Sequence, residues 1–171
     1  MDVVCVTIYK IMISVQTYPH TVIIRHRKEN LRKCSLRGLE DRDDLDFYVY
    51  PKVFPEELKG YVLLDLNAPP LSSADADRGL LLIDGTWRYA KAMVAALQEK
   101  GLLDGTVSRS LPGHYRTAYP RCQQSCPDPD RGLASVEALY LSYLLLERPT
   151  EGFLDNYYWK ESFLKSNGFG D

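Results

Sequence analysis

The chain has 171 residues, of which 45% are hydrophobic and 26% are charged, and its formal net charge is −2. This length is enough for one domain with a proper hydrophobic core, and the composition is typical of globular proteins. A net charge close to zero provides no long-range field that would attract nucleic acid. Any nucleic-acid site must therefore be a local basic patch.

The four cysteines, Cys5, Cys34, Cys122 and Cys126, are scattered along the chain. This usage is typical of reduced thiols in the cytoplasm rather than of a disulfide framework. His114 with the last two cysteines supplies three candidate zinc ligands, but no fourth is evident. We therefore expect no metal site.

Residues 1–15 are mainly apolar and β-branched, with Asp2 near the start and Lys10 in the middle. They lack the cationic start and cleavage site of a signal peptide and are too few to span a bilayer. We expect residues 1–20 to be a leader or an extra strand and residues 21–171 to form the domain. We also expect a cytoplasmic protein that has no membrane partner.

Short apolar runs, bounded by prolines, glycines and polar residues, predict β-strands. They cover residues 21–24, 47–50, 61–66 and 80–83, and the more polar segment 107–111 is a further candidate strand. The run at 80–83 is apolar at every position, which is typical of a strand buried on both faces. Because loops and short helices separate the runs, we expect an α/β fold with a parallel sheet flanked by helices.

A polar turn and a helix follow the run at 80–83. From Trp87 onwards, apolar residues recur at three- and four-residue steps, as on the buried face of a helix. Asp84 or Thr86 is expected to cap the first amides of this helix, and Gly101 is expected to end it. In parallel α/β proteins, ligands also collect at such turns, so Asp84 and Thr86 are candidates both for capping and for binding.

Two further helices are expected in the C-terminal half. One begins near Leu133, with Ser135 as its N-cap and Glu137 in its first turn, where the helix dipole favours negative charge. The last covers residues 152–167. The segment 101–131 contains several prolines and is expected to be mostly an irregular loop.

The stretch Leu82-Ile-Asp-Gly-Thr-Trp-Arg-Tyr-Ala-Lys-Ala-Met resembles the signature of the DTW-domain proteins. These are RNA aminocarboxypropyltransferases that use S-adenosylmethionine, and the related ribosomal RNA enzymes carry a similar Asp-x-Ser-Trp. Upstream, His26-Arg-Lys-Glu-Asn-Leu-Arg-Lys-Cys-Ser resembles the His-x-x-Glu-x-x-x-Lys motif and partly the Lys-Lys-Cys-Thr/Ser-Gly pattern of the ribosomal RNA enzymes. Downstream, Leu133-Ala-Ser-Val-Glu-Ala resembles Leu-Ser-Thr-x-Glu-Ala.

Two more stretches extend the resemblance over residues 21–167. His114-Tyr-Arg-Thr-Ala-Tyr-Pro-Arg is similar to the family's Tyr-Arg-x-Arg-Lys motif but departs from it at residues 117–119. This departure leaves the roles of Arg116 and Arg121 open. The segment Tyr158-Trp-Lys-Glu-Ser-Phe resembles the C-terminal end of the ribosomal RNA enzymes more than that of the tRNA enzymes.

The resemblance implies a SPOUT-like fold with a C-terminal trefoil knot that holds the cofactor. It implies S-adenosylmethionine-dependent transfer of a 3-amino-3-carboxypropyl group to a uridine-type base nitrogen in tRNA or ribosomal RNA. A SPOUT-type RNA methyltransferase would bind the same cofactor in another orientation and transfer its methyl group. A non-catalytic relative would bind RNA without the cofactor. Both remain alternatives at this point.

The resemblance also implies roles for individual residues. Asp84 is expected to be catalytic, either accepting the proton of the target nitrogen or only orienting the base. Cofactor contacts are expected from Ser35, Leu63, Thr86, Trp87, Ala90, Leu111 and Ser135. RNA contacts are expected from Arg25, His26, Arg27, Lys28, Arg32, Lys33, Arg116 and Arg121. By charge alone, the basic segment 25–37 is better explained as a solvated surface that the acidic run 40–46 partly neutralises.

Overall fold

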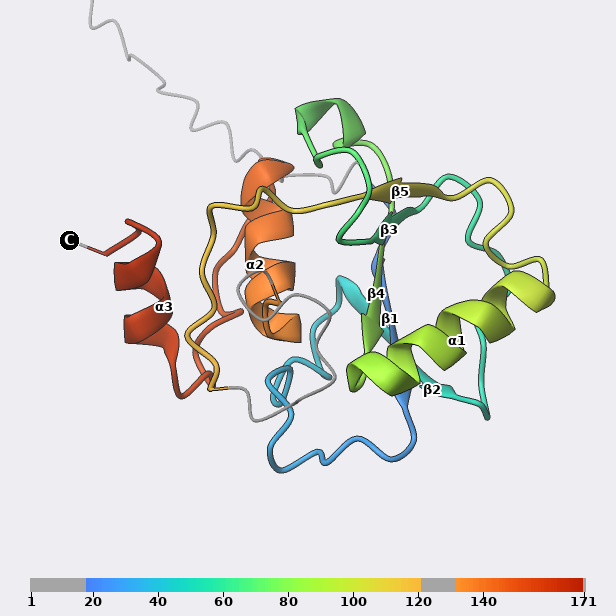
Figure 1. Cartoon of the computed structure of the whole chain (residues 1–171), viewed down its shortest axis with the longest axis horizontal. Coiled ribbons are helices and arrows are strands. Elements are labelled where there is room, and N and C mark those ends of the chain that lie inside the picture. Colours follow the sequence, from blue (N-terminus) through green and yellow to red (C-terminus); the bar gives the residue numbers. More distant parts are fainter. Residues whose placement is uncertain (1–17, 121–131, 171) are drawn as a thin grey trace, which may run out of the picture.

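Five strands form one parallel sheet in the computed structural model, which describes residues 18–120 and 132–170. The strands are β1 (Thr21–His26), β2 (Leu45–Tyr50), β3 (Val62–Leu64), β4 (Leu80–Asp84) and β5 (Val107–Arg109). Their spatial order is β2-β1-β4-β3-β5, and every neighbouring pair is parallel (Figure 1). The predicted single α/β domain with a parallel sheet is confirmed.

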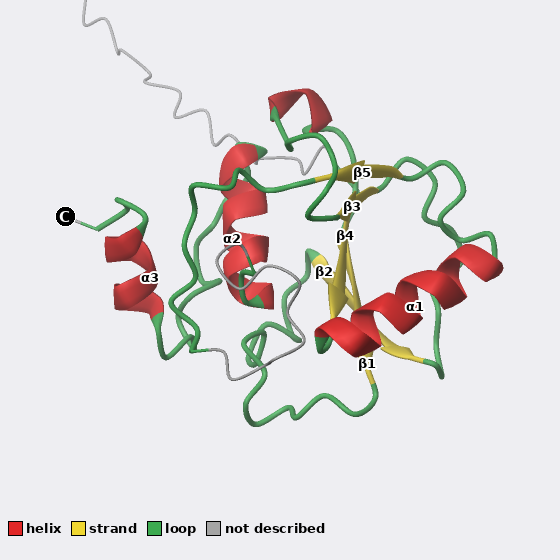
Figure 2. Ribbon diagram, in the orientation of Figure 1, coloured by secondary structure: helices red, strands yellow, loops and turns green. Residues whose placement is uncertain are grey.

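Helices cover both faces of the sheet, so the domain has three layers (Figure 2). α1 (Trp87–Glu99) lies on one face and α2 (Ser135–Leu145) on the other, with α3 (Lys160–Ser166) on the outer side of α2. A short 3-10 helix, η1 (Ser73–Asp75), precedes β4. In the described part of the chain, no helix combines the length and the apolar character that a membrane span needs.

Alternate residues of the central strand β1 face the two helical layers. Ile24 belongs to a core with Met93 of α1, whereas Ile23 belongs to a second core with Leu139 of α2. Phe163 of α3 is part of the second core as well. All residues of β1 are buried, as expected for a strand in the middle of a sheet that is covered on both faces.

The last helix is shorter than predicted. It begins at Lys160, and residues 152–159 form turns instead. Gly152 has a φ of +83°, a left-handed conformation that regular helix does not contain. Phe153 and Leu154 are adjacent and both buried. The expected helix is thus wrong in its first half, because the apolar residues there are anchored individually in the core and not along one helical stripe.

Two predictions depend on residues that the structure does not describe. The N-terminal leader or extra strand falls almost entirely on residues 1–17. The trefoil knot is a property of the continuous path of the chain, part of which runs through residues 121–131. The knot therefore stays a prediction.

Candidate functional site

The carboxyl ends of β1 and β4 meet where the strand order changes direction. From β1 the chain moves to β2 on one side, and from β4 it passes through α1 to β5 on the other. The register pairs Arg25, near the end of β1, with Asp84, the last residue of β4. In open parallel α/β sheets, ligands bind outside the carboxyl ends of the strands at such a switch point.

Asp84 connects three segments of this site. It is 3% exposed, and its Oδ2 atom accepts a hydrogen bond from Nε of Arg25 at 2.8 Å. Its Oδ1 atom accepts one from the hydroxyl of Ser135, also at 2.8 Å, and the thiol of Cys34 donates to Oδ2 at 3.5 Å. The stretches that carry the three family-like motifs therefore converge on one carboxylate.

Arg25 is part of this network and not of the surface. It is 6% exposed, and besides its bond to Asp84 it donates to Oε1 of Glu40 at 2.9 Å. Although burial opposes it, the hydrogen bond from Arg25 lowers the pKa of Glu40. A guanidinium that is buried between two carboxylates is not available to an RNA phosphate. The expected RNA contact of Arg25 is therefore corrected to a role inside the site.

Cys34 is a hydrogen-bond donor in the same network. Burial, together with the negative charge of Asp84, raises the pKa of the Cys34 thiol to about 12. The thiol therefore stays protonated at neutral pH, which allows it to donate to the carboxylate. Since the thiolate is the reactive form of cysteine, this thiol is chemically inert in the folded protein.

We expect iodoacetamide to leave Cys34 unmodified in the native protein at neutral pH, because the thiolate is scarcely populated and the side chain is buried. Peptide mass spectrometry after brief alkylation measures this, and the urea-unfolded protein, in which Cys34 should be labelled fully, is the control. Rapid labelling of Cys34 in the native protein would show that the network around Asp84 opens readily.

The start of α2 differs from the prediction that Ser135 is its N-cap. Ala134 occupies the N-cap position, and its amide donates to Oε2 of Glu137 at 2.8 Å. The hydroxyl of Ser135 is directed to Asp84 instead, and the next amide, of Val136, donates to Oγ of Ser35 at 3.2 Å. Ser35 thus accepts the helix amide that an N-cap side chain would bind, so Ser135 is not needed as a cap, and Ser35 and Ser135 come together at the helix start.

Glu137 is a second buried carboxylate, and it was not among the predicted site residues. It is fully buried and accepts hydrogen bonds from the Thr117 hydroxyl at 2.7 Å and the Ala118 amide at 2.8 Å. The Tyr157 hydroxyl donates to it at 2.8 Å. Glu137 therefore holds the loop that follows β5 against α2. Its position in the Leu-Ser-Thr-x-Glu-Ala-like motif was the only signal in the sequence.

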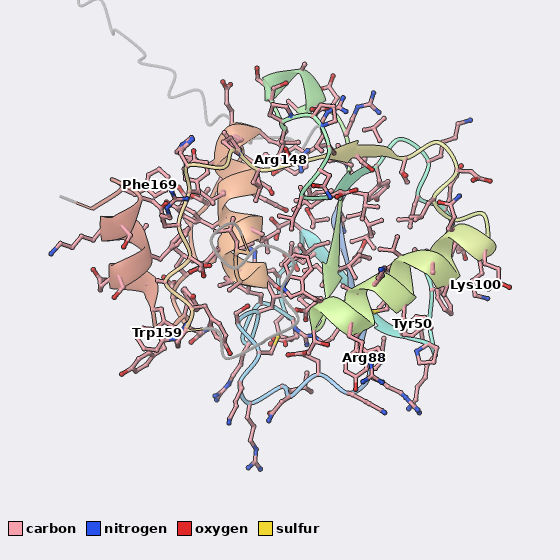
Figure 3. All side chains as sticks on the ribbon, viewed as in Figure 1. Tyr50, Arg88, Lys100, Arg148, Trp159 and Phe169 are labelled. Atoms are coloured by element: carbon pink, nitrogen blue, oxygen red, sulfur yellow. The ribbon has the colours of Figure 1, made fainter. Side chains whose placement is uncertain are left out.

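Of the two residues predicted to cap the start of α1, the structure confirms Thr86. The hydroxyl of Thr86 accepts a hydrogen bond from the amide of Tyr89 at 3.5 Å, whereas the carboxylate of Asp84 is directed to Arg25. Arg88 lies at this end of α1, and Lys100 lies at the far end (Figure 3). Thr86 therefore caps the helix, and the binding role of Asp84 stays a prediction.

The remaining predicted cofactor residues differ in accessibility. Trp87 and Ala90 are half-buried in the first turns of α1, and Leu111 is half-buried in the loop after β5. Leu63 is 8% exposed, and its side chain packs in the core under α1. The side chain of Leu63 is therefore not placed to contact a ligand.

Most of the predicted RNA-binding residues are exposed. Arg27, Lys28, Arg32 and Lys33 lie on the loop after β1, and Arg116 lies on the loop after β5. These cations are accessible to solvent, as phosphate contacts require. Their role in RNA binding stays a prediction.

His26 is an exception, and Arg121 lies outside the described residues. His26 is 8% exposed, and its ring stacks on that of Tyr89, with the centroids 3.9 Å apart and the planes at 2°. Burial, together with the charges of Lys28 and Arg27, lowers the pKa of His26. Its Nδ1 atom accepts the Lys28 amide at 3.2 Å. A neutral imidazole in this setting organises the loop after β1 and is not a phosphate ligand.

A further carboxylate near the network was not among the predicted site residues. Glu29 is half-buried, and burial together with the negative charge of Asp84 raises its pKa. Glu29, Glu40 and Asp84 thus place three carboxylates near the single guanidinium of Arg25. Among these four side chains, the carboxylates outnumber the guanidinium.

Within residues 18–120 and 132–170, no group of three or more His, Cys, Asp or Glu side chains is placed to hold a metal ion. His114 belongs to these residues, but Cys122 and Cys126 do not. The expected absence of zinc therefore stays a prediction.

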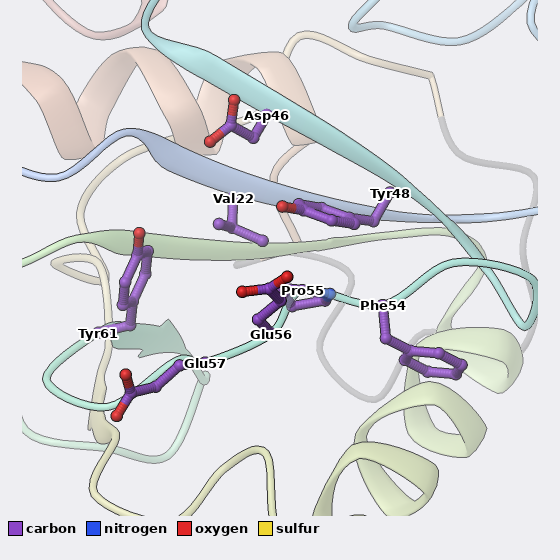
Figure 4. A pocket seen from close by; sticks show the side chains of 8 residues that line it. All are labelled: Val22, Asp46, Tyr48, Phe54, Pro55, Glu56, Glu57 and Tyr61. Atoms are coloured by element: carbon purple, nitrogen blue, oxygen red, sulfur yellow. The ribbon is translucent and has the colours of Figure 1, made fainter.

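An acidic hollow lies towards the other end of the strands (Figure 4). It has a volume of about 450 Å³ and is lined by Val22, Asp46, Tyr48, Phe54, Pro55, Glu56, Glu57 and Tyr61. Val22 and Asp46 are near the amino ends of β1 and β2, opposite to Asp84. Three carboxylates around one hollow repel phosphates, so this part of the surface is unsuited to RNA.

No protein-family model and no curated protein sequence matches the chain. Among solved structures, the chain is similar to the SAM-dependent rRNA:acp-transferase Tsr3 from Vulcanisaeta distributa, with a TM-score of 0.64 and 21% sequence identity. The match covers 86% of this chain and 77% of that chain. At this identity the likeness shows that the two proteins share their fold over most of their lengths.

Proposed function

We propose that this protein binds S-adenosylmethionine at the carboxyl ends of β1 and β4 and transfers its 3-amino-3-carboxypropyl group to a uridine-type nitrogen of RNA. The observation that carries the proposal is the convergence of the three motif segments on Asp84 at the switch point of the sheet. The shared fold with Tsr3, a SAM-dependent rRNA:acp-transferase, supports it. Because that protein acts on rRNA, we favour ribosomal RNA over tRNA as the substrate.

The charges near Asp84 suit this cofactor. Three carboxylates, Glu29, Glu40 and Asp84, lie near one guanidinium, that of Arg25. S-adenosylmethionine carries a sulfonium and an ammonium group, and carboxylates attract both. The residues present therefore fit the cofactor.

Positioning is the main task of the residues around the cofactor. When bound, S-adenosylmethionine supplies an activated methylene carbon beside its sulfonium. Trp87 offers an aromatic wall for the adenine or the methyl group, and Ala90 leaves space one turn further on. The start of α2 at Ser135 suits the carboxylate of the cofactor, and the backbone of Leu111 suits its adenosine. Together these contacts aim the amino acid arm at the RNA.

Asp84 is the residue that we propose to act on the target nitrogen. It either accepts the imino proton or orients the target nucleobase by a hydrogen bond. Its donors from Arg25, Cys34 and Ser135 leave about one of its four lone pairs to face the imino group of the target nucleobase, in either role. Asp84 then keeps a fixed orientation while the target base is bound.

Mass spectrometry of nucleosides tests the proposed function. The purified protein is incubated with S-adenosylmethionine and ribosomal RNA from cells that lack the gene, and we expect a 3-amino-3-carboxypropyl adduct on a uridine-type base. A methyl adduct would identify a methyltransferase instead. Binding of RNA without binding of S-adenosylmethionine would identify a non-catalytic relative.

Replacement of Trp87 by Ala should weaken the binding of S-adenosylmethionine by about 1 kcal/mol or more, because it removes a large aromatic surface. Isothermal titration calorimetry measures the effect. Trp159→Ala is the matched control, since Trp159 is also half-buried but lies before α3 (Figure 3). Equal affinities of the two folded variants would assign Trp87 to the core instead of to the cofactor site.

A further inference from the structure

Aromatic and basic side chains gather beside the candidate site, at the start of α1. The ring of Tyr89 stacks on His26, and two cations lie over it. Nζ of Lys28 and Cζ of Arg88 are each 6.0 Å from the centroid of the Tyr89 ring. Lys28 follows β1, whereas Arg88 belongs to the first turn of α1. One tyrosine thus brings together cations from two separate segments.

These cations occupy a place where a helix disfavours them. The first turn of α1 contains no acidic residue, and Arg88 and Lys91 are both exposed near its amino end. The positive end of the helix dipole lies there, so a cation is less favourable than it would be elsewhere on the helix. Arg27 and Lys28 add two exposed cations from the facing loop. Such an arrangement is stabilised when an anion binds to it.

The cluster is anchored to the core and therefore preorganised. The Lys28 amide donates to Nδ1 of His26, which fixes the start of the loop. His26 also contacts Tyr50, with the ring centroids 5.7 Å apart, and Tyr50 contacts Phe54 edge to face at 5.9 Å. The row of rings joins the end of β1 to the end of β2. A surface that is fixed in this way loses little freedom when it binds a ligand.

We propose that Lys28 and Arg88 hold a phosphate of the RNA chain next to the target nucleotide. Lys28 lies three residues after Arg25, and Arg88 lies four residues after Asp84, so this subsite borders the ion pair at the centre of the candidate site. Arginine and lysine are the residues that bind phosphate oxygens most strongly. The subsite rests on the proposed function, because it takes RNA as the substrate.

The charges of the described side chains indicate where on the surface the RNA binds. The hollow towards the amino ends of the strands is acidic, with Asp46, Glu56 and Glu57 in its lining. The cations of the subsite are at the carboxyl ends. A polyanion is therefore attracted to Lys28 and Arg88 and repelled from the hollow.

Arg88→Gln and Lys100→Gln test the subsite as a matched pair. Each removes one positive charge at an end of α1, but Lys100 is the C-cap residue at the far end, with Nζ 4.8 Å from the ring centroid of Phe54 (Figure 3). Fluorescence anisotropy with a labelled oligouridylate measures affinity at several salt concentrations. We expect Arg88→Gln to reduce the slope of log affinity against log salt by about 0.7. We expect no change for Lys100→Gln.

The same loss of one phosphate contact should weaken binding about fivefold in roughly 0.1 M salt, and Lys28→Gln should act like Arg88→Gln. Equal slopes for Arg88→Gln and Lys100→Gln would overturn the subsite. If the wild-type protein still formed the RNA adduct in that case, the proposed function would stand. If the wild-type protein bound neither oligouridylate nor S-adenosylmethionine, the subsite and the proposed function would both be wrong.

Discussion

Replacement of Asp84 by Asn should lower the single-turnover rate of transfer by about a hundredfold or more, with nearly normal affinity for S-adenosylmethionine. The amide cannot accept a proton, and it cannot satisfy the donors of Arg25 and Ser135 in the same way. The protein should also lose about 3 kcal/mol of stability, the low end for a broken buried ion pair, since Glu40 still accepts from Arg25 at 2.9 Å. Rapid-quench kinetics and urea unfolding measure the two effects.

Asp75→Asn is the matched control for this variant. Asp75 is also 3% exposed and is paired with Arg109 at 2.9 Å and Arg78 at 3.5 Å, but it lies near the edge strand β5. The Asp75→Asn variant should lose stability while keeping the single-turnover rate of the wild-type protein. A folded Asp84→Asn variant that transfers the group as fast as Asp75→Asn would exclude both proposed roles of Asp84.

A double-mutant cycle with Arg25→Met separates the two roles. If Asp84 orients the target nucleobase, the orientation of the Asp84 carboxylate matters. Arg25→Met should then slow transfer about as much as Asp84→Asn does. The double variant should add little to either loss, because the two residues act as one unit. If Arg25→Met instead kept most of the rate, Asp84 would be identified as the proton acceptor.

The sheet could be predicted because its central strands are buried on both faces, which makes them continuous apolar runs. The helix after β4 could be predicted from its spacing and from the cap at Thr86. The first half of the last predicted helix was wrong for a tertiary reason. The left-handed backbone at Gly152 and the separate anchoring of Phe153 and Leu154 leave no trace in helical periodicity.

The candidate site was predictable as a set of positions but not as a network. Asp84 and Ser135 were identified by resemblance, yet their hydrogen bond joins residues that are 51 positions apart. Arg25 and His26 were grouped with the basic loop because the apolar run ends at residue 24. In the structure β1 continues through both residues, and the pairing with β4 buries Arg25 against Asp84. The register between distant strands decides this, and charge along the sequence does not reveal it.

The second large effect is expected at Glu137. Its carboxylate accepts hydrogen bonds from Thr117, Ala118, Ala134 and Tyr157 and is fully buried. In Glu137→Gln, one oxygen remains to accept these bonds, and the new amide group is itself a donor. Since each buried donor that loses its acceptor costs about 1–3 kcal/mol, we expect a loss of about 3 kcal/mol or more in urea unfolding.

Glu137→Gln should also affect the candidate site, through the loop after β5. Without Glu137, Thr117 and Ala118 no longer hold the loop against α2, and we expect weaker binding of S-adenosylmethionine because the loop carries Leu111. Tyr157→Phe removes one donor and leaves the carboxylate three, so it should cost only about 1.5 kcal/mol. Glu151→Gln, at an exposed glutamate, is the control and should change neither quantity. If Glu137→Gln were as stable as Glu151→Gln, the buried carboxylate would not be what fastens this loop to the domain.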